Sequence, residues 1–483
     1  MTARRGAGFA VAAVAFVMPL WLVGYLPMVD LPQHAAQLSI WTHLHDAAWG
    51  FAATHQINYR TPYVLCYLVA RPFVGLLGPA GALKVLISLV VVGLPASLWL
   101  LLASLDFDPW WALLGFPLAF GYSFYWGFLN FGVASCVGLV FLALAERYGR
   151  RPTARAGAAV ALGAIALFVA HPLAFAICFP TALARPCFWR ARLVARWPFV
   201  APLPLVVLWY LTAARDTATH GPMVWELGSH RLSWMPALLL GHRGDRLAAV
   251  MGAVLVALPL LGFRARATVA SWLPAAGIVL TLAVGPQLAF GTAFLYGRAA
   301  VFLVPFLFFA LEPTPRGAWA RPLRALVAVA VALWALLLCA RFAAFDEEAR
   351  GFATVEAAMK PGASVRSLIF ANQSPAVPGV AVYLHLPLYY QADHGGANGF
   401  SFAASPFAFA HYRAGVGNRL PTDAEWTPQR FRWRREPRYD YYVVRAPDDL
   451  GPQLFAGAGA TIRLAAHDGW WWLYAGPSDP TGD

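Results

Sequence analysis

Long apolar stretches separated by short polar ones dominate residues 1–345. A helix that crosses a bilayer needs roughly 20 apolar residues, and about eleven stretches approach that length. They lie at about residues 8–28, 81–104, 109–124, 128–146, 156–171, 172–186, 197–214, 247–263, 271–290, 299–311 and 323–341. Residues 62–78 are apolar but short, and Arg71 and Pro72 interrupt them, so we expect a juxtamembrane segment there.

From about residue 346 the pattern changes to short runs rich in β-branched and aromatic side chains, which are typical of strands. These runs are SVRSLIFA, VAVYLHLPLYY, RYDYYVVRA, ATIRLAA and GWWWLYAG. The glycine-rich segment QADHGGANGFSF is expected to be a loop. The pattern therefore predicts a mostly α-helical polytopic membrane protein, with a transmembrane domain at residues 1–345 and a small α/β or mostly-β soluble domain at residues 346–483.

Composition supports a membrane protein. The 483 residues are 60% hydrophobic and 12% charged, whereas soluble proteins are about 25% charged. The net charge of +13 does not indicate nucleic-acid binding, because the arginines lie in short clusters between apolar stretches, as at residues 147–155, 185–196 and 316–324. Such clusters face the cytoplasm. They predict a cytoplasmic N-terminus, held by residues 8–28 as an uncleaved anchor, and an extracytoplasmic C-terminal domain.

The first predicted outer loop begins with VDLPQHAAQLSIWTHLHD, residues 29–46, which is rich in polar groups for this chain. Pro32 suits the first turn of a helix, and Asp30 then lies at the helix N-terminus. His34 follows one turn later on the same face. Asp30 and His34 are therefore candidate catalytic residues, with Asp30 as a general base. The alternative is an N-cap on a helix that anchors at the membrane surface.

The predicted outer turn YSFYWGFLN, residues 122–130, is unusually aromatic. Tyr122, Tyr125 and Trp126 are candidates for stacking on a sugar, and Asn130 is a candidate hydrogen-bonding partner. The alternative is an aromatic belt at the membrane interface.

Arg298 leads directly into a predicted span, and an arginine at that depth is costly unless it is paired or used. Its planar fork matches phosphate geometry, so we expect it to bind a lipid phosphate. Arg243, in the predicted outer loop 215–246, and His171, in a tight outer turn, are candidates for the same site. The alternative for Arg298 is snorkelling to the interface.

The sequence indicates no metal site or cofactor. The five cysteines show no C-x-x-C spacing. His43 and His45 are one residue apart and do not share a helical face.

The layout of an N-terminal span, an outer loop that starts with Asp30, a juxtamembrane segment, two spans and an outer turn resembles the GT-C superfamily of glycosyltransferases. It is similar to the branch that contains protein O-mannosyltransferases and the lipid A aminoarabinose transferase. The resemblance implies that Asp30 is the base, that the donor is a polyprenyl-phosphate sugar, and that Arg298 contacts its phosphate. One departure is that residues 122–130 hold no acid, whereas family members often do.

We therefore expect an inverting glycosyltransferase of the bacterial inner membrane that acts on an envelope glycan, lipid or protein at the outer face. Two other classes stay open, a non-enzymatic carrier or flippase of lipid-linked saccharide and a structural protein of envelope assembly. Pseudo-symmetric halves would favour a carrier, and no internal repeat is obvious. The sequence leaves the sugar and the acceptor open.

Overall fold

The computed structural model describes residues 3–185, 193–214, 222–290, 292–315, 317, 320–405, 407–419, 424–458 and 461–477. Parts of the predicted basic clusters at 185–196 and 316–324, and of the predicted loop 215–246, lie outside these residues. The chain forms two compact units, each built from segments distant in sequence. The first comprises residues up to Leu20, Pro62–Cys66 and Leu86–Ala340, and the second comprises Trp21–Thr61, Tyr67–Val85 and the residues from Arg341 onward.

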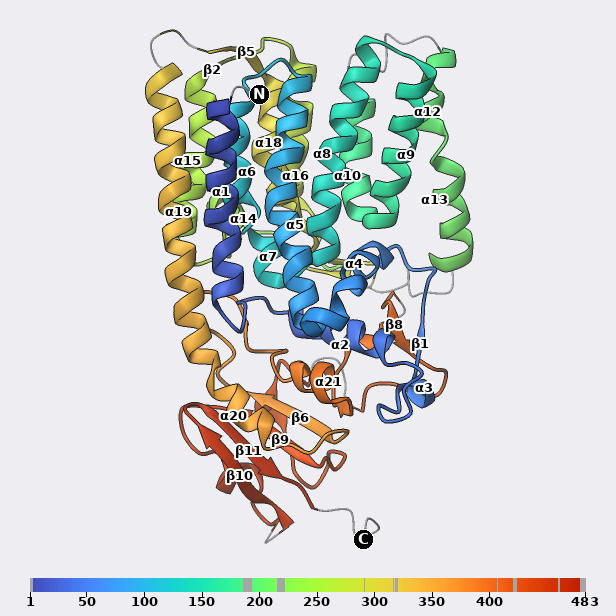
Figure 1. Ribbon diagram of the computed structural model, residues 1–483, viewed down its shortest axis with the longest axis vertical. Helices are drawn as coiled ribbons and strands as arrows, with labels where there is room; N and C mark the ends of the chain where they lie inside the picture. The colour runs from blue at the N-terminus through green and yellow to red at the C-terminus, as the bar shows by residue number, and fades with distance from the viewer. Residues whose placement is uncertain are drawn as a thin grey trace. The chain divides into compact units, whose positions relative to one another are not determined.

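Apolar helices make up most of the first unit (Figure 1). Those wholly or mainly within it are α1 (Ala3–Leu22), α5 (Val74–Ser104), α6 (Gly115–Leu118), α7 (Tyr122–Trp126), α8 (Leu129–Arg150), α9 (Ala154–Ala170), α10 (Pro172–Leu183), α12 (Trp197–Val200), α13 (Leu203–Trp209), α14 (His230–Leu238), α15 (Arg246–Gly262), α16 (Val269–Val284), α17 (Leu295–Arg298), α18 (Leu303–Leu307) and α19 (Ala320–Ala349). Short strands β2 (Phe263–Ala265) and β5 (Leu311–Pro315) pair with each other, as do β3 (Leu288–Ala289) and β4 (Thr292–Ala293).

Three helical segments in the described chain are long and apolar enough to cross a membrane. They are Val64–Ser104, Leu129–Arg150 and Arg321–Ala357. Shorter apolar helices include α9, α10, α15 and α16. The length and composition of the three long segments agree with the membrane character expected from the sequence.

Most predicted spans coincide with one helix, but three do not. Residues 109–124 are divided into η2 (Pro109–Leu114), α6 and α7, and residues 299–311 into η5 (Ala299–Phe302), α18 and η6 (Phe308–Ala310). The third, residues 197–214, is divided into α12, α13 and η4 (Tyr210–Ala214). Pro117 lies inside the first stretch and Pro305 inside the second. Proline removes a backbone donor and clashes with the preceding turn, so neither stretch is one continuous helix. The count of eleven spans is not confirmed.

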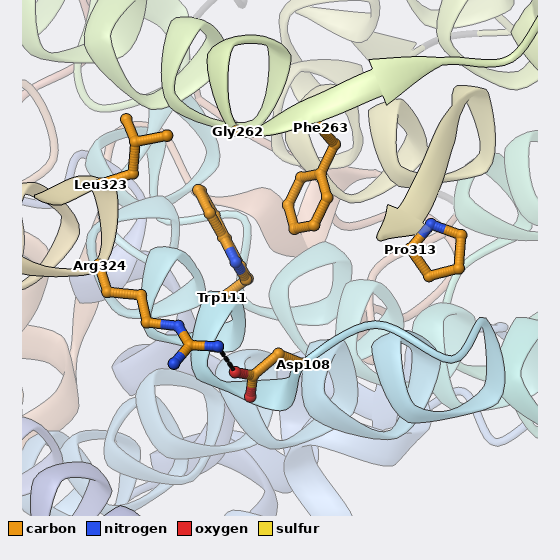
Figure 2. Close-up of a pocket in the computed structure, with 7 residues that line it drawn as sticks. All are labelled: Asp108, Trp111, Gly262, Phe263, Pro313, Leu323 and Arg324. Atoms are coloured by element: carbon orange, nitrogen blue, oxygen red, sulfur yellow. Dashed lines mark hydrogen bonds and ion pairs between the residues drawn. The ribbon is translucent and has the colours of Figure 1, made fainter. Parts of the chain in front are cut away.

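Ion pairs fasten the loop after α5 to other helices of the first unit. Asp106 lies 2.9 Å from Arg150 of α8, and Asp108 pairs with Arg324 of α19. Beside the second pair is a cavity of about 60 Å³ (Figure 2). It is lined by Asp108, Trp111, Gly262, Phe263, Pro313, Leu323 and Arg324. Its size suits only a few water molecules, so we regard it as a packing gap.

The second unit contains, within its described residues, a five-stranded sheet in the order β10-β11-β9-β6-β7. The strands are β6 (Ser364–Ile369), β7 (Ala397–Asn398), β9 (Tyr441–Arg445), β10 (Arg463–Asp468) and β11 (Trp471–Ala475). β6 is parallel to β7 and β9, and the other pairs are antiparallel. All five residues of β9 are buried, as a central strand covered on both faces requires. The predicted C-terminal sheet is confirmed.

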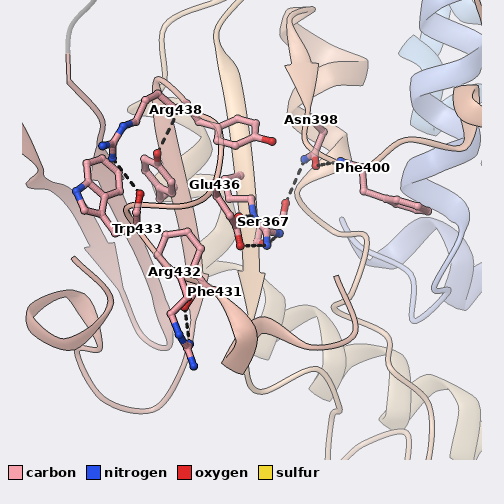
Figure 3. Close-up of polar contacts among 11 residues, drawn as sticks. Ser367, Asn398, Phe400, Phe431, Arg432, Trp433, Glu436 and Arg438 are labelled. Atoms are coloured by element: carbon pink, nitrogen blue, oxygen red, sulfur yellow. Dashed lines mark hydrogen bonds and ion pairs between the residues drawn. The ribbon is translucent and has the colours of Figure 1, made fainter. Parts of the chain in front are cut away.

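Polar contacts hold residues 431–438 and the edge strand β7 against strand β6 (Figure 3). Arg366 of β6 pairs with Glu436 at 2.9 Å. The Asn398 amide of β7 donates to Ser367 Oγ at 3.1 Å. Helices α20 (Gly351–Ala357), α21 (Leu388–His394) and α22 (Gly451–Leu454) complete the C-terminal part.

One predicted strand, residues 380–390, is wrong. The segment forms turns and then the first residues of α21. Pro387 is the N-cap of that helix and has no N–H to donate to a strand ladder. Residues Val380–Tyr390 are buried on every side, which explains an apolar composition that resembled a strand.

The first loop belongs to the second unit together with the C-terminal segment. It contains α2 (Leu31–Thr42), α3 (Phe51–Thr54) and β1 (His55–Ile57), followed later by α4 (Val64–Ala70). α2 packs against α21, and β1 pairs with β8 (Ala410–Tyr412). The predicted boundary between residues 345 and 346 stays a prediction.

Candidate functional site

Asp30 occupies the N-cap position of α2, and Pro32 lies in the first turn, as expected from the sequence. The carboxylate makes no capping hydrogen bond. Instead, Asp30 Oδ1 lies 3.1 Å from Nδ1 of His385. The side chain is buried, with 7% of the residue exposed. The capping interpretation therefore accounts for the position of Asp30 and not for its side chain.

His385 lies between two carboxylates. Its Nδ1 faces Asp30, and its Nε2 is 3.0 Å from Oε2 of Glu425. Burial by itself would lower the pKa of His385, but Glu425 and Asp30 outweigh this and raise it to about 10. The ring is therefore an imidazolium at neutral pH, and it holds both carboxylates.

The charges alternate beyond Glu425. Burial raises the pKa of Glu425, while His385 and Arg366 oppose that rise. Arg366 is itself 2% exposed and pairs with Glu436. Asp30, His385, Glu425, Arg366 and Glu436 thus form a series of alternating charge, which we call the Asp30 charge series. The first four are buried and Glu436 is half-buried.

His34 and its neighbours on α2 bind protein groups. Tyr67 donates its hydroxyl hydrogen to Gln37 Oε1 at 3.0 Å. His34 Nδ1 lies 2.7 Å from the same hydroxyl, so Nδ1 carries the hydrogen and donates it to Tyr67. Gln33 accepts from the Phe402 N–H. The polar residues Gln33, His34 and Gln37 of α2 are buried against other parts of the second unit.

Arg298 ends α17 in the first unit and is 8% exposed. Its Nε donates to the Phe294 carbonyl at 3.2 Å, and its Nη2 donates to the Ala293 carbonyl at 3.0 Å. The guanidinium also lies 3.5 Å from the centre of the Phe128 ring, in cation–π range. Phe294 has φ +58°, a strained value for a bulky residue. The guanidinium is thus held in a single orientation by a strained turn.

His171 lies beside Arg298. It caps α10, and its Nδ1 accepts the Leu173 N–H at 3.1 Å. The Nη1 group of Arg298 points at Nε2 of the same ring in a long hydrogen bond of 3.4 Å. His171 therefore helps to hold the guanidinium in place, and the planar fork of Arg298 is the group here that matches the geometry of a phosphate.

The aromatic residues of 122–130 are buried rather than exposed at a lipid interface. Tyr122, Tyr125 and Trp126 are each 5% exposed or less. The Tyr122 ring stacks on His242, and the Trp126 ring stacks on Phe294 at 3.9 Å. These rings form a wall beside the turn that holds Arg298, and their contact with a sugar stays a prediction.

The other predicted ligands lie in the same unit. The Asn130 side-chain oxygen is buried and accepts no hydrogen bond from any residue in the described part of the chain. Arg243 is on the surface, 5.3 Å from the centre of the Trp234 ring. Gly297 permits the close approach of Tyr122, because a Cβ there would lie 2.7 Å from that ring.

The structure thus brings His171 and Arg298 together in the first unit, and Asp30 and His385 together in the second. The role of both sets in one reaction, which the resemblance implies, stays a prediction. His385 and Glu425 were missed, because nothing near them in sequence indicated a link to Asp30. Among the residues the structure describes, no three His, Cys, Asp or Glu side chains are grouped to hold a metal ion.

The whole chain has the fold of the GT-C glycosyltransferases, which confirms the resemblance found in the sequence. Within that class it is similar to ArnT from Cupriavidus metallidurans. The crystal structure of ArnT bound to undecaprenyl phosphate covers 99% of this chain and 98% of its own, with a TM-score of 0.54 and 15% identity. The apo structure covers 97% of each chain, with a TM-score of 0.52 and 14% identity.

Similarity at this level of identity establishes the fold. No family model matches the sequence, and no curated protein matches it significantly.

Proposed function

We propose that this protein is a membrane glycosyltransferase that transfers a sugar from a polyprenyl-phosphate donor to an envelope acceptor, with inversion at the anomeric carbon. The main support is the buried guanidinium of Arg298, held in one orientation by two backbone carbonyls with His171 beside it, because a planar guanidinium matches the geometry of a phosphate. The fold supports the same class, since a solved protein of this fold is described as bound to undecaprenyl phosphate.

In the proposed reaction, the Asp30 carboxylate takes the proton of an acceptor hydroxyl. The hydroxyl oxygen forms a bond to the anomeric carbon, and the bond from that carbon to the phosphate oxygen breaks. The bonding electrons leave with polyprenyl phosphate. Arg298, with His171 beside it, donates to the phosphate as the charge of the leaving group grows, the type of stabilisation that usually dominates such a barrier.

Other residues have supporting roles in this proposal. Arg243, on the surface of the same unit, would attract the anionic head group. Tyr122, Tyr125, Trp126 and Asn130 would shape the sugar site beside Arg298, with the buried Asn130 oxygen accepting a sugar hydroxyl. His34 would hold α2 in place through Tyr67 and Gln37.

The proposed location is the bacterial inner membrane, with the N-terminus in the cytoplasm and residues 346–483 outside. This orientation puts the basic clusters inside. Membrane-impermeant thiol labelling of single cysteines introduced near residues 150 and 400 tests it. Labelling near 400 alone is expected, and labelling near 150 alone would reverse the orientation.

The decisive experiment measures transfer from a labelled polyprenyl-phosphate sugar in proteoliposomes. Asp30→Asn keeps the shape of the side chain but removes the proton acceptor, so the rate should fall by about 10²–10⁴. Asp46→Asn is the matched control, because Asp46 is an exposed acid of the same loop. Full transfer by Asp30→Asn would exclude its role as the base.

The same proteoliposomes distinguish a transferase from a carrier and from a structural protein. A flippase would move labelled lipid-linked saccharide across the bilayer without transferring it, and Asp30→Asn would leave that movement intact. A structural assembly protein would show neither activity.

A further inference from the structure

The position of Asp30 gives its side chain two competing partners. Asp at an N-cap ordinarily accepts a hydrogen bond from the N–H of the second or third helical residue. The second residue of α2 is Pro32, which has no N–H, so the available capping donor is Gln33. The carboxylate nevertheless makes no capping bond and lies against His385. The imidazolium therefore outcompetes the helix end for this carboxylate.

Burial explains why a neutral partner would not suffice. Asp30, His385 and Glu425 are 7%, 3% and 9% exposed, and a buried charge without a counter-charge is strongly destabilising. One imidazolium between two carboxylates leaves a net negative charge. Arg366 lies on the Glu425 side and pairs with Glu436, so the Asp30 charge series as a whole has two cations and three anions.

His385 has no nitrogen left for a substrate. Nδ1 faces Asp30 and Nε2 faces Glu425. The ring stacks on Phe400 and contacts the edge of Phe402, which leaves it enclosed. In contrast, Oδ2 of Asp30 forms no hydrogen bond within the described ranges. Any effect of His385 on the chemistry must therefore pass through Asp30.

We propose that His385 and Glu425 are positioning residues of the transferase, and that this inference rests on the function proposed above. His385 binds Oδ1 of Asp30, holds the carboxylate off the end of α2, and leaves Oδ2 to take the acceptor proton. Glu425 keeps the proton on His385. Without this pair, the Asp30 carboxylate rotates to cap α2 at Gln33 and leaves the reacting position.

The test compares Glu425→Gln and His385→Gln with wild type in the proteoliposome assay. For both variants we expect kcat to fall by about 10², as for a misplaced catalytic group, while KM for the donor stays unchanged. The matched control is His467→Gln, since His467 is an exposed histidine of the C-terminal sheet. Unchanged kcat in both variants would overturn the proposal.

A pH profile separates positioning from a merely structural role. Wild type should keep its kcat until His385 loses its proton near pH 10. In Glu425→Gln one carboxylate is gone, so the alkaline decline should begin about 1–3 pH units lower. The groups that face the ring are Asp30 and Glu425, with Arg366 and Glu436 beyond them. An alkaline limb that does not move would contradict the role of Glu425.

Histidine ¹⁵N NMR tests the charge state without any activity. The His385 signal, assigned by its loss in His385→Gln, should be that of an imidazolium at pH 8 in wild type. A neutral ring at pH 8 in wild type would overturn the inference. An imidazolium signal in a protein that transfers no sugar would instead refute the proposed function and leave the Asp30–His385 pair standing.

Discussion

Arg298→Lys is the sharpest test of the proposed phosphate site, because it keeps the positive charge and removes the planar arrangement of N–H donors. The guanidinium donates from Nε and Nη2 to two backbone carbonyls while Nη1 stays beside His171. A lysine ammonium is one point with three donors and cannot span these positions. It would either bind the carbonyls or face the phosphate.

The expected loss of affinity follows from the hydrogen bonds that the lysine cannot make at the same time. Each hydrogen bond from a charged donor contributes about 1.5–3 kcal/mol. An ammonium that turns to the phosphate must give up at least one of the two carbonyl bonds, so this amount is lost from the free energy of binding. A loss of about 1.5–3 kcal/mol in binding corresponds to roughly 10- to 100-fold in Kd. We therefore expect Arg298→Lys to bind undecaprenyl phosphate about 10- to 100-fold more weakly.

The measurement is titration of undecaprenyl phosphate into the purified protein in detergent, read by intrinsic tryptophan fluorescence. The control is Arg150→Lys, since Arg150 is exposed and forms an ion pair with Asp106 away from the proposed site. The control should bind as wild type does. Equal affinity in Arg298→Lys, with an unchanged melting temperature, would refute the assignment of Arg298 to the phosphate.

Two further predictions concern packing and pH. Gly297→Val places a side chain against the Tyr122 ring, and such overpacking costs about 1–3 kcal/mol of stability. Both the melting temperature and the affinity for undecaprenyl phosphate should therefore fall. Gly277→Ala, which has open space around it, should change neither. Burial lowers the pKa of His55 to about 4. The folded protein therefore keeps this ring neutral while the unfolded chain takes up a proton below about pH 6.5. The free energy of unfolding should fall by about 3 kcal/mol in all as the pH drops from 6.5 to 4. Thermal melts of wild type and His55→Phe between pH 4 and 7 should therefore differ in slope, and parallel curves would contradict this.

The helical part of the fold was predictable for most of the long apolar runs. α8, for example, corresponds closely to the predicted span 128–146. The failures include the stretches that contain Pro117 and Pro305, where hydropathy alone exceeded what the backbone allows. The position of proline alone would not have corrected them, because α5 continues through Pro95 and α10 through Pro180.

The error at residues 380–390 has another cause. Alternating β-branched and aromatic residues predict a strand because they suit a pleated, half-buried surface. Here the segment is buried on every side and ends at Pro387. Full burial removes the need for alternation, so the local pattern could not distinguish a buried turn from a strand.

Part of the candidate site could be predicted from neighbouring residues, and part depends on residues that are distant in sequence. The place of Asp30 at a helix start follows from Pro32 two residues later, and the phosphate role proposed for Arg298 was suggested by its position at the start of an apolar stretch. The partner of Asp30 is 355 residues away in sequence, and no spacing rule links the two.

The sequence nevertheless limits which residues can pair with Asp30. A chain with 12% charged residues has few counter-charges, and a buried acid needs one. His385 lies in an apolar segment of the C-terminal domain, where an isolated imidazole is itself costly without a partner. Pairing the isolated polar residues of such segments with one another, rather than interpreting each alone, would have made His385 a candidate for Asp30.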